Sequence, residues 1–466
     1  MLRNAKPVDA DDVPAEDVVV SVQEASEHEP LMEPDTKDTD KKPAAKKAAI
    51  AAAPPTKVLF LDGVRGLAAI MVCTSHSKEY MADIDLGAIA VDAFFVLSSF
   101  LLTWLFMKKS MKLLAQGASI RKWAFTLADY FSKRFCRVYP LFAVTAVVIW
   151  MLPAEAKTRY YLIQDPDKFD LYKVLTFEFS HRYFVFWTLP LEIAYYFFIP
   201  VLVLAILMLR RFWWIPFLPM YYCVINEGWY EFRTSHMELR PHFPTFVAGS
   251  MAAIIFVKLD TWIKATGFEF RKTHVFMIRV IEYITIAVFL SLCFHGLFFH
   301  WVHANTAPNE KGFSFISVLL TVLFVIEMIL PSCVSTMFEW SVLRYWGKIS
   351  FSVYLLHSFI LYARVIGAQP NWYDKVFSRF ILILLLSTVS YHLVEYPSQL
   401  LSQRITKALA EQEAKGSGGL ATLFGGHPSQ LAQRLARAQE AKIPSGLMKF
   451  GKSSTADKSH AHEATA

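Results

Sequence analysis

The stretch FLDGVRGLAAIMVCTSH, residues 60–76, begins a long apolar region and carries three ionisable side chains. Arg65 and His76 are eleven residues apart, so an α-helix places them on nearly the same face, about 16 Å apart along its axis. Asp62 comes three residues before Arg65 and shares that face. Ionisable groups within an apolar helix are costly and usually face a cavity. The stretch therefore predicts a helix whose polar stripe is directed into a helix bundle and has a function.

The composition predicts a membrane protein. Of the 466 residues, 55% are hydrophobic and 19% are charged, whereas about a quarter of the residues of a soluble domain are charged. The apolar residues also come in blocks of about twenty, the length that crosses a hydrocarbon core as a helix. We therefore expect an all-α polytopic membrane helix bundle of about ten transmembrane helices. Their expected ranges are 58–79, 88–107, 136–153, 184–208, 212–225, 243–258, 275–295, 314–334, 346–366 and 376–394. The fifth and sixth are short, so a re-entrant or broken helix there stays open.

The chain divides into a membrane domain and two tails. Residues 1–57 are expected to be a disordered cytoplasmic tail, because they are polar and poor in aromatic residues. Residues 58–402 form the transmembrane domain, and residues 403–466 form a cytoplasmic C-terminal tail with amphipathic segments suited to a membrane surface. Lys and Arg are concentrated in alternate loops, and with ten spans this pattern places both termini in the cytoplasm.

Several other classes of protein are disfavoured. The net charge of +7 is attributed to the cytoplasmic loops and does not indicate a nucleic-acid partner. The Cys and His spacings match no zinc site, and no glycine-rich phosphate loop is present, so no metal site is expected. The five cysteines are scattered through apolar blocks, which does not suggest a disulfide framework.

Two carboxylates are expected at the depth of His76. Asp92 lies near the outer end of the second predicted span, after a short hairpin. A carboxylate beside a histidine fixes its tautomer and stabilises its charged form, although Asp92 could instead cap the helix N-terminus. Glu192 lies one to two turns inside the fourth span, where it could assist proton transfer or form a structural hydrogen bond.

A pair of arginines is expected at the cytoplasmic border. The segment SKRFCRVYP places Arg134 and Arg137 three residues apart on one helix face. Guanidinium groups bind phosphate well, so these two residues, with Lys133 as a third candidate, are predicted to bind a phosphate-bearing ligand. The alternative is that they only fix the helix at the membrane surface.

Seven motifs follow one another along the chain: DGVRG, the Arg-x₁₀-His spacing, VDAFFVLSSF, SKRFCRVYP, FWTLPLEIAYY, WGKISFSVYLLH and LVEYP. Over about residues 58–404 they resemble the acyltransferase-3 family of integral membrane O-acyltransferases. The resemblance implies transfer of an acyl group, acetyl by default, from cytoplasmic acyl-CoA to a hydroxyl group. In this resemblance His76 matches the essential histidine, Arg65 its paired basic residue and Glu192 the acid of the fourth span.

The match to the family pattern extends to Arg134 and Arg137, which match its Arg-x-x-Arg of the cytoplasmic loop. Two glycines of the pattern are missing from the second span, where this chain has Ala90 and Ser99. Their loss is expected to reduce close backbone approach at that span, which leaves the shape of the cavity and the acyl chain length open. We expect no soluble esterase-like domain after the membrane part, unlike in some relatives.

Three further ionisable residues occupy predicted spans. His357 lies in the middle of SFSVYLLHSFI and is a candidate site residue, with a packing role as the alternative. Glu327 matches no motif and is expected to pair with a basic residue of another span. Glu395, at the inner end of the last span, is expected to pair with a cytoplasmic arginine.

The expected activity is that of an acyl-CoA-dependent O-acyltransferase in which His76 deprotonates the acceptor or is itself acylated first. No cofactor is expected beyond acyl-CoA as a co-substrate. The expected partners are an acyl-CoA donor, a hydroxyl-bearing carbohydrate, lipid or small-molecule acceptor, and membrane lipids, in the endoplasmic reticulum or the plasma membrane. The oligomeric state is open, and so are two other functions: a secondary transporter, and an inactive acyl-CoA-binding membrane protein.

Overall fold

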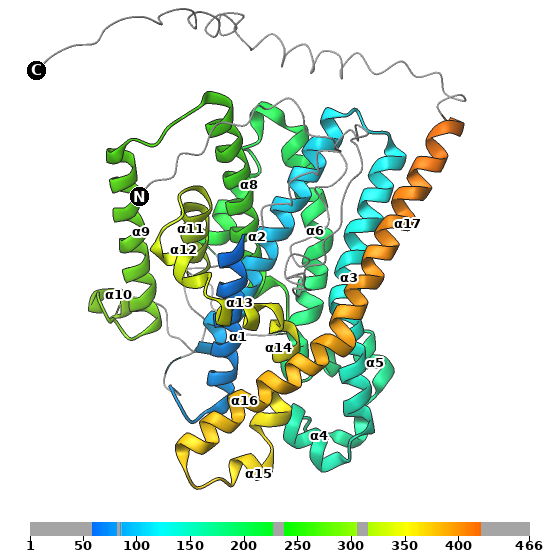
Figure 1. Ribbon diagram of the computed structural model, residues 1–466, viewed down its shortest axis with the longest axis vertical. Helices are drawn as coiled ribbons and strands as arrows, with labels where there is room; N and C mark the ends of the chain where they lie inside the picture. Colours follow the sequence, from blue (N-terminus) through cyan, green and yellow to red (C-terminus); the bar gives the residue numbers. More distant parts are fainter. Residues whose placement is uncertain (1–57, 82–83, 85, 227–236, 305–315, 421–466) are drawn as a thin grey trace, which may run out of the picture.

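The regular structure of the chain is helical. The computed structural model describes residues 58–81, 84, 86–226, 237–304 and 316–420. Within these ranges all the regular elements are helices, and the longest of them run side by side as a bundle (Figure 1). The predicted all-α class is therefore confirmed. The tail at residues 1–57 lies outside the described residues, so its disorder and the cytoplasmic position of both termini stay predictions.

Seven helical segments of the described chain are long and apolar enough to cross a membrane. Each of them coincides with one of the ten ranges expected from the sequence. They are Leu59–Ser77 (α1), Leu86–Ala115 (α2), Ile120–Met151 (α3), Phe184–Met208 (η3 and α6), Arg240–Thr266 (η6 and α8), Lys272–Cys293 (α9) and Trp372–Glu413 (α16, η8 and most of α17). The sixth expected range, which is short in the sequence, belongs to α8 (Phe243–Thr266), a helix of 24 residues.

The three other expected ranges contain shorter helices. Within the described chain α7 (Phe217–Ile225) has 9 residues, α11 (Ile316–Ile329) has 14 and α14 (Ser350–Leu361) has 12. All three fall short of the roughly 20 residues that cross a bilayer. The structure therefore does not confirm a count of ten spans.

Local breaks in the chain explain two of these short helices. Pro331 follows α11, and Ser332 then caps the next helix, α12 (Cys333–Phe338), by accepting a hydrogen bond from Val334 N. One non-helical residue, Ile349, separates α13 (Ser341–Lys348) from α14. Both breaks lie inside apolar sequence, so a hydropathy pattern cannot show them.

Helix α1 approaches α12 and α13 so closely that only glycine fits at the contact. A Cβ on Gly63 would lie 1.7 Å from the carbonyl oxygen of Phe338, and one on Gly66 would lie 1.9 Å from that of Leu343. On the other side, a Cβ on Gly347 of α13 would lie 1.9 Å from a carbonyl oxygen of α1. The two glycines of the opening stretch therefore determine how α1 packs, and with it the position of its polar stripe.

We expect Gly66→Ala to destabilise the protein strongly, because the obstructing atom belongs to the backbone of α13 and cannot move as a side chain can. Overpacking typically lowers the free energy of unfolding by about 1–3 kcal/mol. Because the obstacle is a backbone atom, we expect Gly66→Ala to cost about 3 kcal/mol or more. Thermal unfolding in detergent measures the effect. Gly367→Ala is the matched control, because nothing lies within 4 Å of a Cβ at that position in α15 (Arg364–Gly367). Equal melting temperatures for both variants would contradict the prediction.

Helix α2 is central and packs against α1, α6 (Thr188–Met208), α8 and α11. A Cβ on Gly249 of α8 would lie 2.1 Å from Ser99 Oγ and 2.7 Å from the carbonyl oxygen of Val96, both on α2. The expected loss of close approach at this span is therefore wrong at Ser99. The glycine on the facing helix provides the space that the second span itself lacks.

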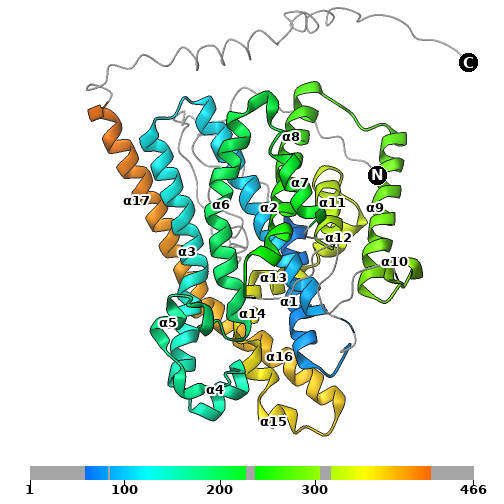
Figure 2. The same cartoon turned by 180° about the vertical axis from the view of Figure 1, so that it is seen from behind.

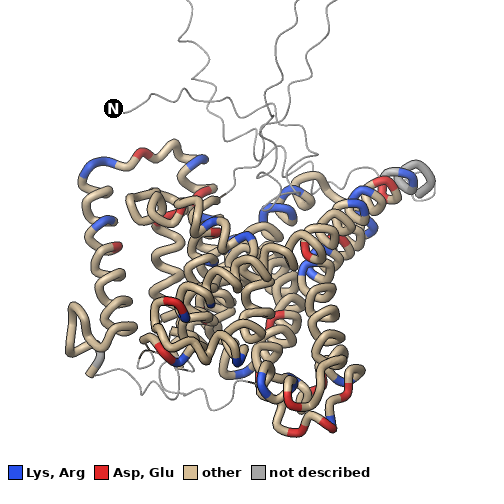
Figure 3. Tube along the Cα trace, turned by 60° about the horizontal axis from the view of Figure 1, so that its bottom comes forward, with Lys and Arg blue, Asp and Glu red and all other residues tan. Residues whose placement is uncertain are grey.

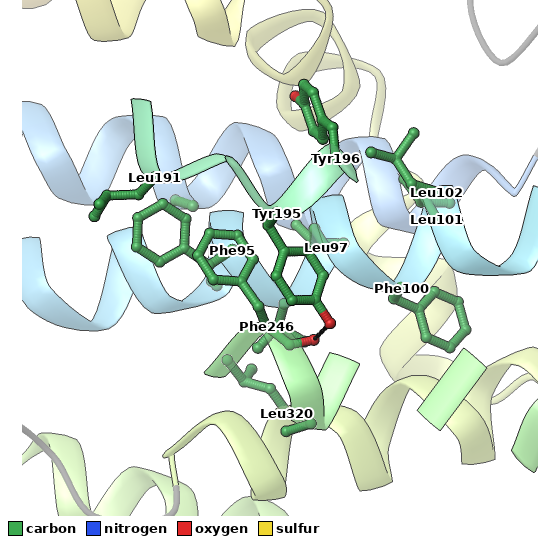
Figure 4. Close-up of a cluster of buried hydrophobic side chains, with 14 of the residues drawn as sticks. Phe95, Leu97, Phe100, Leu101, Leu102, Leu191, Tyr195, Tyr196, Phe246 and Leu320 are labelled. Atoms are coloured by element: carbon green, nitrogen blue, oxygen red, sulfur yellow. Dashed lines mark hydrogen bonds between the residues drawn. The ribbon is translucent and has the colours of Figure 1, made fainter. Parts of the chain in front are cut away.

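Aromatic rings hold α2, α6 and α8 together beside this contact (Figure 4). The ring of Phe246 on α8 lies 4.4 Å from that of Phe95 on α2 and 4.6 Å from that of Tyr195 on α6, between ring centroids. The hydroxyls of Tyr195 and Ser250 are 2.8 Å apart, and that of Ser250 is 2.9 Å from Thr103 Oγ1. Hydrogen bonds between neighbouring helices stabilise a bundle that has little water inside.

Helix α17 (Tyr396–Leu420) packs along α3, as both views show (Figures 1 and 2). Asp129 of α3 joins the helices at this contact. Its carboxylate accepts a hydrogen bond from Thr406 Oγ1 of α17 at 2.7 Å, and forms ion pairs with Lys109 of α2 at 2.8 Å and with Lys133 at 3.1 Å. The helix continues past residue 403, where the C-terminal tail is expected to begin, and its first part packs in the bundle.

Most of the tube in Figure 3 belongs to uncharged residues, and the charged residues are sparse along the helices of the bundle. This distribution suits a protein whose middle lies in lipid, because a charged side chain there is costly. The few charged groups inside the bundle are therefore the first place to look for a function.

Candidate active site

A cavity of about 150 Å³ lies inside the bundle. Its wall is mainly apolar and comes from α1, α2, α3, the η3–α6 segment and α14. The polar side chains that line it are Arg65, Ser98, Arg134, Arg137, Thr188, Glu192, Tyr196, Ser350 and Tyr354. The structure therefore brings together, around one cavity, four of the residues that the sequence nominates: the three arginines and Glu192.

The arginines give this cavity a positive wall. Arg65 comes from α1, and Arg134 and Arg137 lie one turn apart on α3. Arg65 has an ion pair with Asp62, with 3.7 Å between Nη1 and Oδ1, whereas neither arginine of α3 forms an ion pair with another described residue. Guanidinium groups that line a cavity without carboxylate partners are suited to an anionic ligand, and phosphate fits their geometry best.

Glu192 provides a carboxylate at the same cavity. It lies on α6 and accepts a hydrogen bond from Ser98 Oγ of α2. Its charge acts on both Arg65 and Arg134. Tyr196 lies one turn later on α6 and lines the same wall. Glu192 is therefore placed both to orient the cations and to contact a hydroxyl group that enters the cavity.

His76, in the last turn of α1, faces a second histidine. Its Nδ1 lies 2.8 Å from Nε2 of His357 on α14, a residue 281 positions later in the chain. The ring planes differ by 8° and the centroids are 5.0 Å apart. The two nitrogens are 2.8 Å apart and the two ring centroids are 5.0 Å apart. Both distances hold together only if each nitrogen lies close to the line between the centroids and faces the other nitrogen. The contact is therefore a hydrogen bond between two nearly coplanar imidazoles.

The predicted partner of His76 was Asp92, which is fully buried on α2. Among the described contacts the hydrogen bond of His76 is with His357, and no described hydrogen bond or ion pair joins His76 to Asp92. The role of Asp92 stays a prediction. His357, whose site role was left open against packing, occupies the position beside His76 that the sequence analysis gave to the carboxylate.

Aromatic side chains pack around the histidine pair. The Phe184 ring lies 4.9 Å from the His76 ring and 5.6 Å from the His357 ring, between centroids. Tyr354 lies one turn before His357 on α14, with 6.4 Å between the two rings, and also lines the cavity. Its hydroxyl accepts a hydrogen bond from Thr188 Oγ1 at 3.0 Å and donates one to the Val185 carbonyl at 3.2 Å. Tyr354 thus lies beside His357 and also lines the cavity, so the histidine pair is next to the cavity.

Five polar residues at this wall were missed from the sequence: Ser98, Thr188, Tyr196, Ser350 and Tyr354. Ser98 and Tyr354 lie inside motifs already quoted, and Tyr354 precedes His357 by three residues, on one helix face. That spacing could have nominated Tyr354. Nothing in the sequence pairs Ser98 with Glu192, because the two residues meet only when α2 packs on α6.

A second buried polar cluster lies where α9, α11 and α12 meet, and none of its residues lines the cavity. Arg279 of α9 forms an ion pair with Glu282, whose side chain is fully buried, and its Nη1 lies 3.8 Å from Glu327 Oε1 on α11. Ser332 Oγ lies 2.5 Å from Glu327 Oε1 and 2.9 Å from Glu282 Oε1. The prediction that Glu327 pairs with a basic residue of another span is therefore confirmed.

Glu395 lies at the end of η8 (Tyr391–Glu395), a single turn of π-helix between α16 (Trp372–Ser390) and α17. Its carboxylate accepts a hydrogen bond from Ser352 Oγ of α14. The charge of Arg137 acts on it, but no described ion pair joins the two residues. The expected pairing of Glu395 with a cytoplasmic arginine is therefore not confirmed, and its described hydrogen-bond partner is Ser352.

The fold and the site define a class of protein: an integral membrane helix bundle with an arginine-lined cavity beside a pair of histidines. The profile of the acyltransferase-3 family, described as an acyltransferase domain, matches residues 58–393. The chain therefore belongs to the acyltransferase-3 family, as the order of its motifs predicts.

Curated relatives are distant. A Staphylococcus aureus (strain COL) protein, whose name gives O-acetyltransferase as its suspected activity, is 24% identical over 370 residues, which cover 72% of this chain and 56% of that protein. A Rhizobium radiobacter protein named protein 2 in the picA locus is 31% identical over 97 residues, which cover 21% of this chain and 46% of that protein. The chain spans about half the length of these curated relatives. No solved structure matches it.

Proposed function

We propose that the protein is a membrane O-acyltransferase that moves an acyl group, acetyl by default, from cytoplasmic acyl-CoA to a hydroxyl group of its acceptor. The observation that carries the proposal is the convergence of Arg65, Arg134 and Arg137 on one cavity next to the His76–His357 pair. Family membership and the name of the Staphylococcus aureus relative support the reaction type. The acceptor class is a carbohydrate, a lipid or a small molecule.

In this proposal the donor binds through its phosphates. Arg134 and Arg137 bind them as bidentate partners, and Arg65 adds a third positive charge. The pantetheine arm then follows the face of α1 from Arg65 to His76, an axial distance of about 16 Å for eleven helical residues. The thioester consequently lies beside the histidines, and the aromatic wall around them excludes water that would hydrolyse it.

The chemical step is an attack of the acceptor oxygen on the thioester carbonyl. His76 takes the hydroxyl proton, the new C–O bond forms, the C–S bond breaks, and the thiolate of CoA leaves with a proton. A route through an acyl-histidine would use the same residue as a nucleophile first. Glu192, hydrogen-bonded to Ser98, is proposed to assist proton transfer or to orient the acceptor, and Asp92 to support His76 from α2.

We expect the Arg134→Ala/Arg137→Ala double variant to bind acyl-CoA at least about 10²-fold more weakly than the wild type. Each lost hydrogen bond to a charged group removes about 1.5–3 kcal/mol, and 1.4 kcal/mol corresponds to a factor of ten in Kd. The measurement is the rise in melting temperature of the detergent-purified protein across a concentration series of acetyl-CoA, longer acyl-CoAs and free CoA.

The matched control is Arg210→Ala/Arg211→Ala, which removes the same charge from two exposed residues outside the cavity. It should keep the wild-type shift. If no thioester raises the melting temperature of folded wild-type protein, the proposed donor is wrong. If acyl-CoA binds but no acceptor panel yields product or free CoA, the protein is a binding protein and not an enzyme.

A further inference from the structure

We propose that His357 is a positioning residue that fixes the tautomer of His76, with the proton on Nδ1 and the lone pair of Nε2 available as the base. The inference deepens the proposed function and rests on it for its catalytic meaning. The assignment of the tautomer stands on hydrogen-bond geometry and on burial, and it does not depend on the enzymatic activity. It assigns to a neutral histidine the orienting role that a carboxylate has in a Ser-His-Asp triad.

The assignment begins at the backbone of α14. His357 Nδ1 lies 3.0 Å from the carbonyl oxygen of Val353, one turn earlier. A carbonyl oxygen can only accept a hydrogen bond, so Nδ1 of His357 must carry the proton that it donates. A backbone atom of a packed helix therefore determines the state of the imidazole.

The second step follows from burial. The His357 side chain is fully buried within the bundle, where an uncompensated charge is costly, so the imidazole is neutral. A neutral imidazole carries one proton, which Nδ1 already holds, so Nε2 of His357 presents a lone pair. The 2.8 Å contact then requires His76 Nδ1 to be the donor. A base must be neutral before it takes a proton, and in neutral His76 the single proton is then on Nδ1, so the remaining nitrogen, Nε2, presents a lone pair.

Packing keeps the two rings in this arrangement. Phe184 contacts both imidazoles, and its backbone has φ 46°, a conformation that is rare for a bulky residue. The ring of Tyr354 also lies beside that of His357. Its hydroxyl both accepts and donates a hydrogen bond, which fixes the position of the ring. A strained residue persists only where its surroundings hold it, and such residues are frequent at active sites.

The proton balance of the transfer follows from this assignment. Nε2 of His76 accepts the proton of the acceptor hydroxyl while the acceptor oxygen bonds to the acyl carbon. The His76 imidazolium still donates its Nδ1 proton to the lone pair on His357 Nε2. This hydrogen bond stabilises the positive charge of His76, although His357 itself carries no negative charge. When the C–S bond breaks, Nε2 returns its proton to the thiolate, so the products are the ester and CoA thiol, and both histidines regain their resting state.

Two substitutions at position 357 separate this role from simple packing. His357→Gln keeps a side-chain oxygen that can accept a hydrogen bond from His76, whereas His357→Phe keeps a ring of similar shape without an acceptor. The tautomer is read by ¹⁵N NMR of protein labelled at histidine, with His76→Gln used to identify the His76 signals by difference. We expect the Nδ1–H form in the wild type and in His357→Gln, and its loss in His357→Phe.

Kinetics gives an independent readout. We expect His357→Phe to lower kcat by about 10²–10³-fold with little change in KM for acyl-CoA, a smaller loss than the roughly 10⁴-fold seen when a triad histidine has the wrong tautomer. His357→Gln should recover kcat to within about tenfold of the wild type. A purely structural role would instead lower the melting temperature and leave the tautomer of His76 unchanged.

An Nε2–H form of His76 in the wild type would overturn the proposal, and so would wild-type kcat in folded His357→Phe. Because the NMR measurement needs no turnover, an Nδ1–H signal in a protein without transferase activity would refute the proposed function and leave the tautomer assignment intact. If His357→Phe does not fold, the wild-type and His357→Gln spectra still decide the tautomer.

Discussion

His76→Gln is expected to lower the rate of acyl transfer by about 10³-fold or more and to leave acyl-CoA binding close to that of the wild type. A positioned general base contributes about 10²–10⁴-fold, and the loss rises further if the histidine also carries the acyl group. The arginines that are proposed to bind phosphate are untouched, because no described contact joins any of them to His76. Binding comes from the thermal shift with acetyl-CoA, and transfer from the release of free CoA in the presence of acceptor.

The control for this prediction is His274→Gln, on an exposed histidine at the start of α9. It should behave as the wild type in both measurements. Folded His76→Gln that transfers acyl groups at the normal rate would remove His76 from the mechanism. A variant that loses acyl-CoA binding together with transfer would instead point to a role in donor binding.

Arg279→Met is expected to destabilise the protein by about 3–5 kcal/mol, the usual cost of removing one partner of a buried ion pair. The substitution leaves Glu282, whose side chain is fully buried, and Glu327, whose side chain is 3% exposed, without the cation between them. It also removes the hydrogen bonds from Arg279 Nη2 to the carbonyl oxygens of Leu330 at 2.7 Å and Pro331 at 2.9 Å. A large fall in melting temperature should follow.

The test of the cause is a second substitution that removes one carboxylate charge. Arg279→Met/Glu282→Gln leaves a single acid in the cluster, hydrogen-bonded by Ser332, and should recover at least half of the lost stability. Lys264→Met serves as the surface control, since its ion pair with Asp260 is exposed and should contribute little. A single variant Arg279→Met as stable as the wild type would show that the buried cluster contributes nothing net.

The all-α fold could be predicted because the membrane imposes a strong restriction on sequence. A segment that crosses lipid must satisfy its own backbone hydrogen bonds and be apolar over about twenty residues, and both requirements are visible locally. The predicted count of ten spans is not confirmed where an apolar segment is interrupted, as at Pro331 after α11 and at Ile349 before α14. Such breaks depend on capping and packing, which change the hydropathy of a segment very little.

The candidate site was predicted in part. Arg65, Arg134, Arg137 and Glu192 were nominated from motif resemblance and from expected depth, and the structure places all four at one cavity. The partner of His76 was not predicted, because depth alone could not separate Asp92 from the other polar residues at the same level. A residue 281 positions away becomes the neighbour only through the packing of α1 on α14.

The sequence by itself determined that the chain is a helical membrane protein of the acyltransferase-3 family, and it identified several of the charged residues that lie inside it. These properties depend on composition, helical periodicity and short motifs, each read within one segment. Only the tertiary structure decided which of these residues meet: His76 with His357, Ser98 with Glu192, and Arg279 with Glu327. The physical reason is that side-chain pairing between helices depends on crossing geometry, which here is set by close contacts such as those at Gly66 and Gly249.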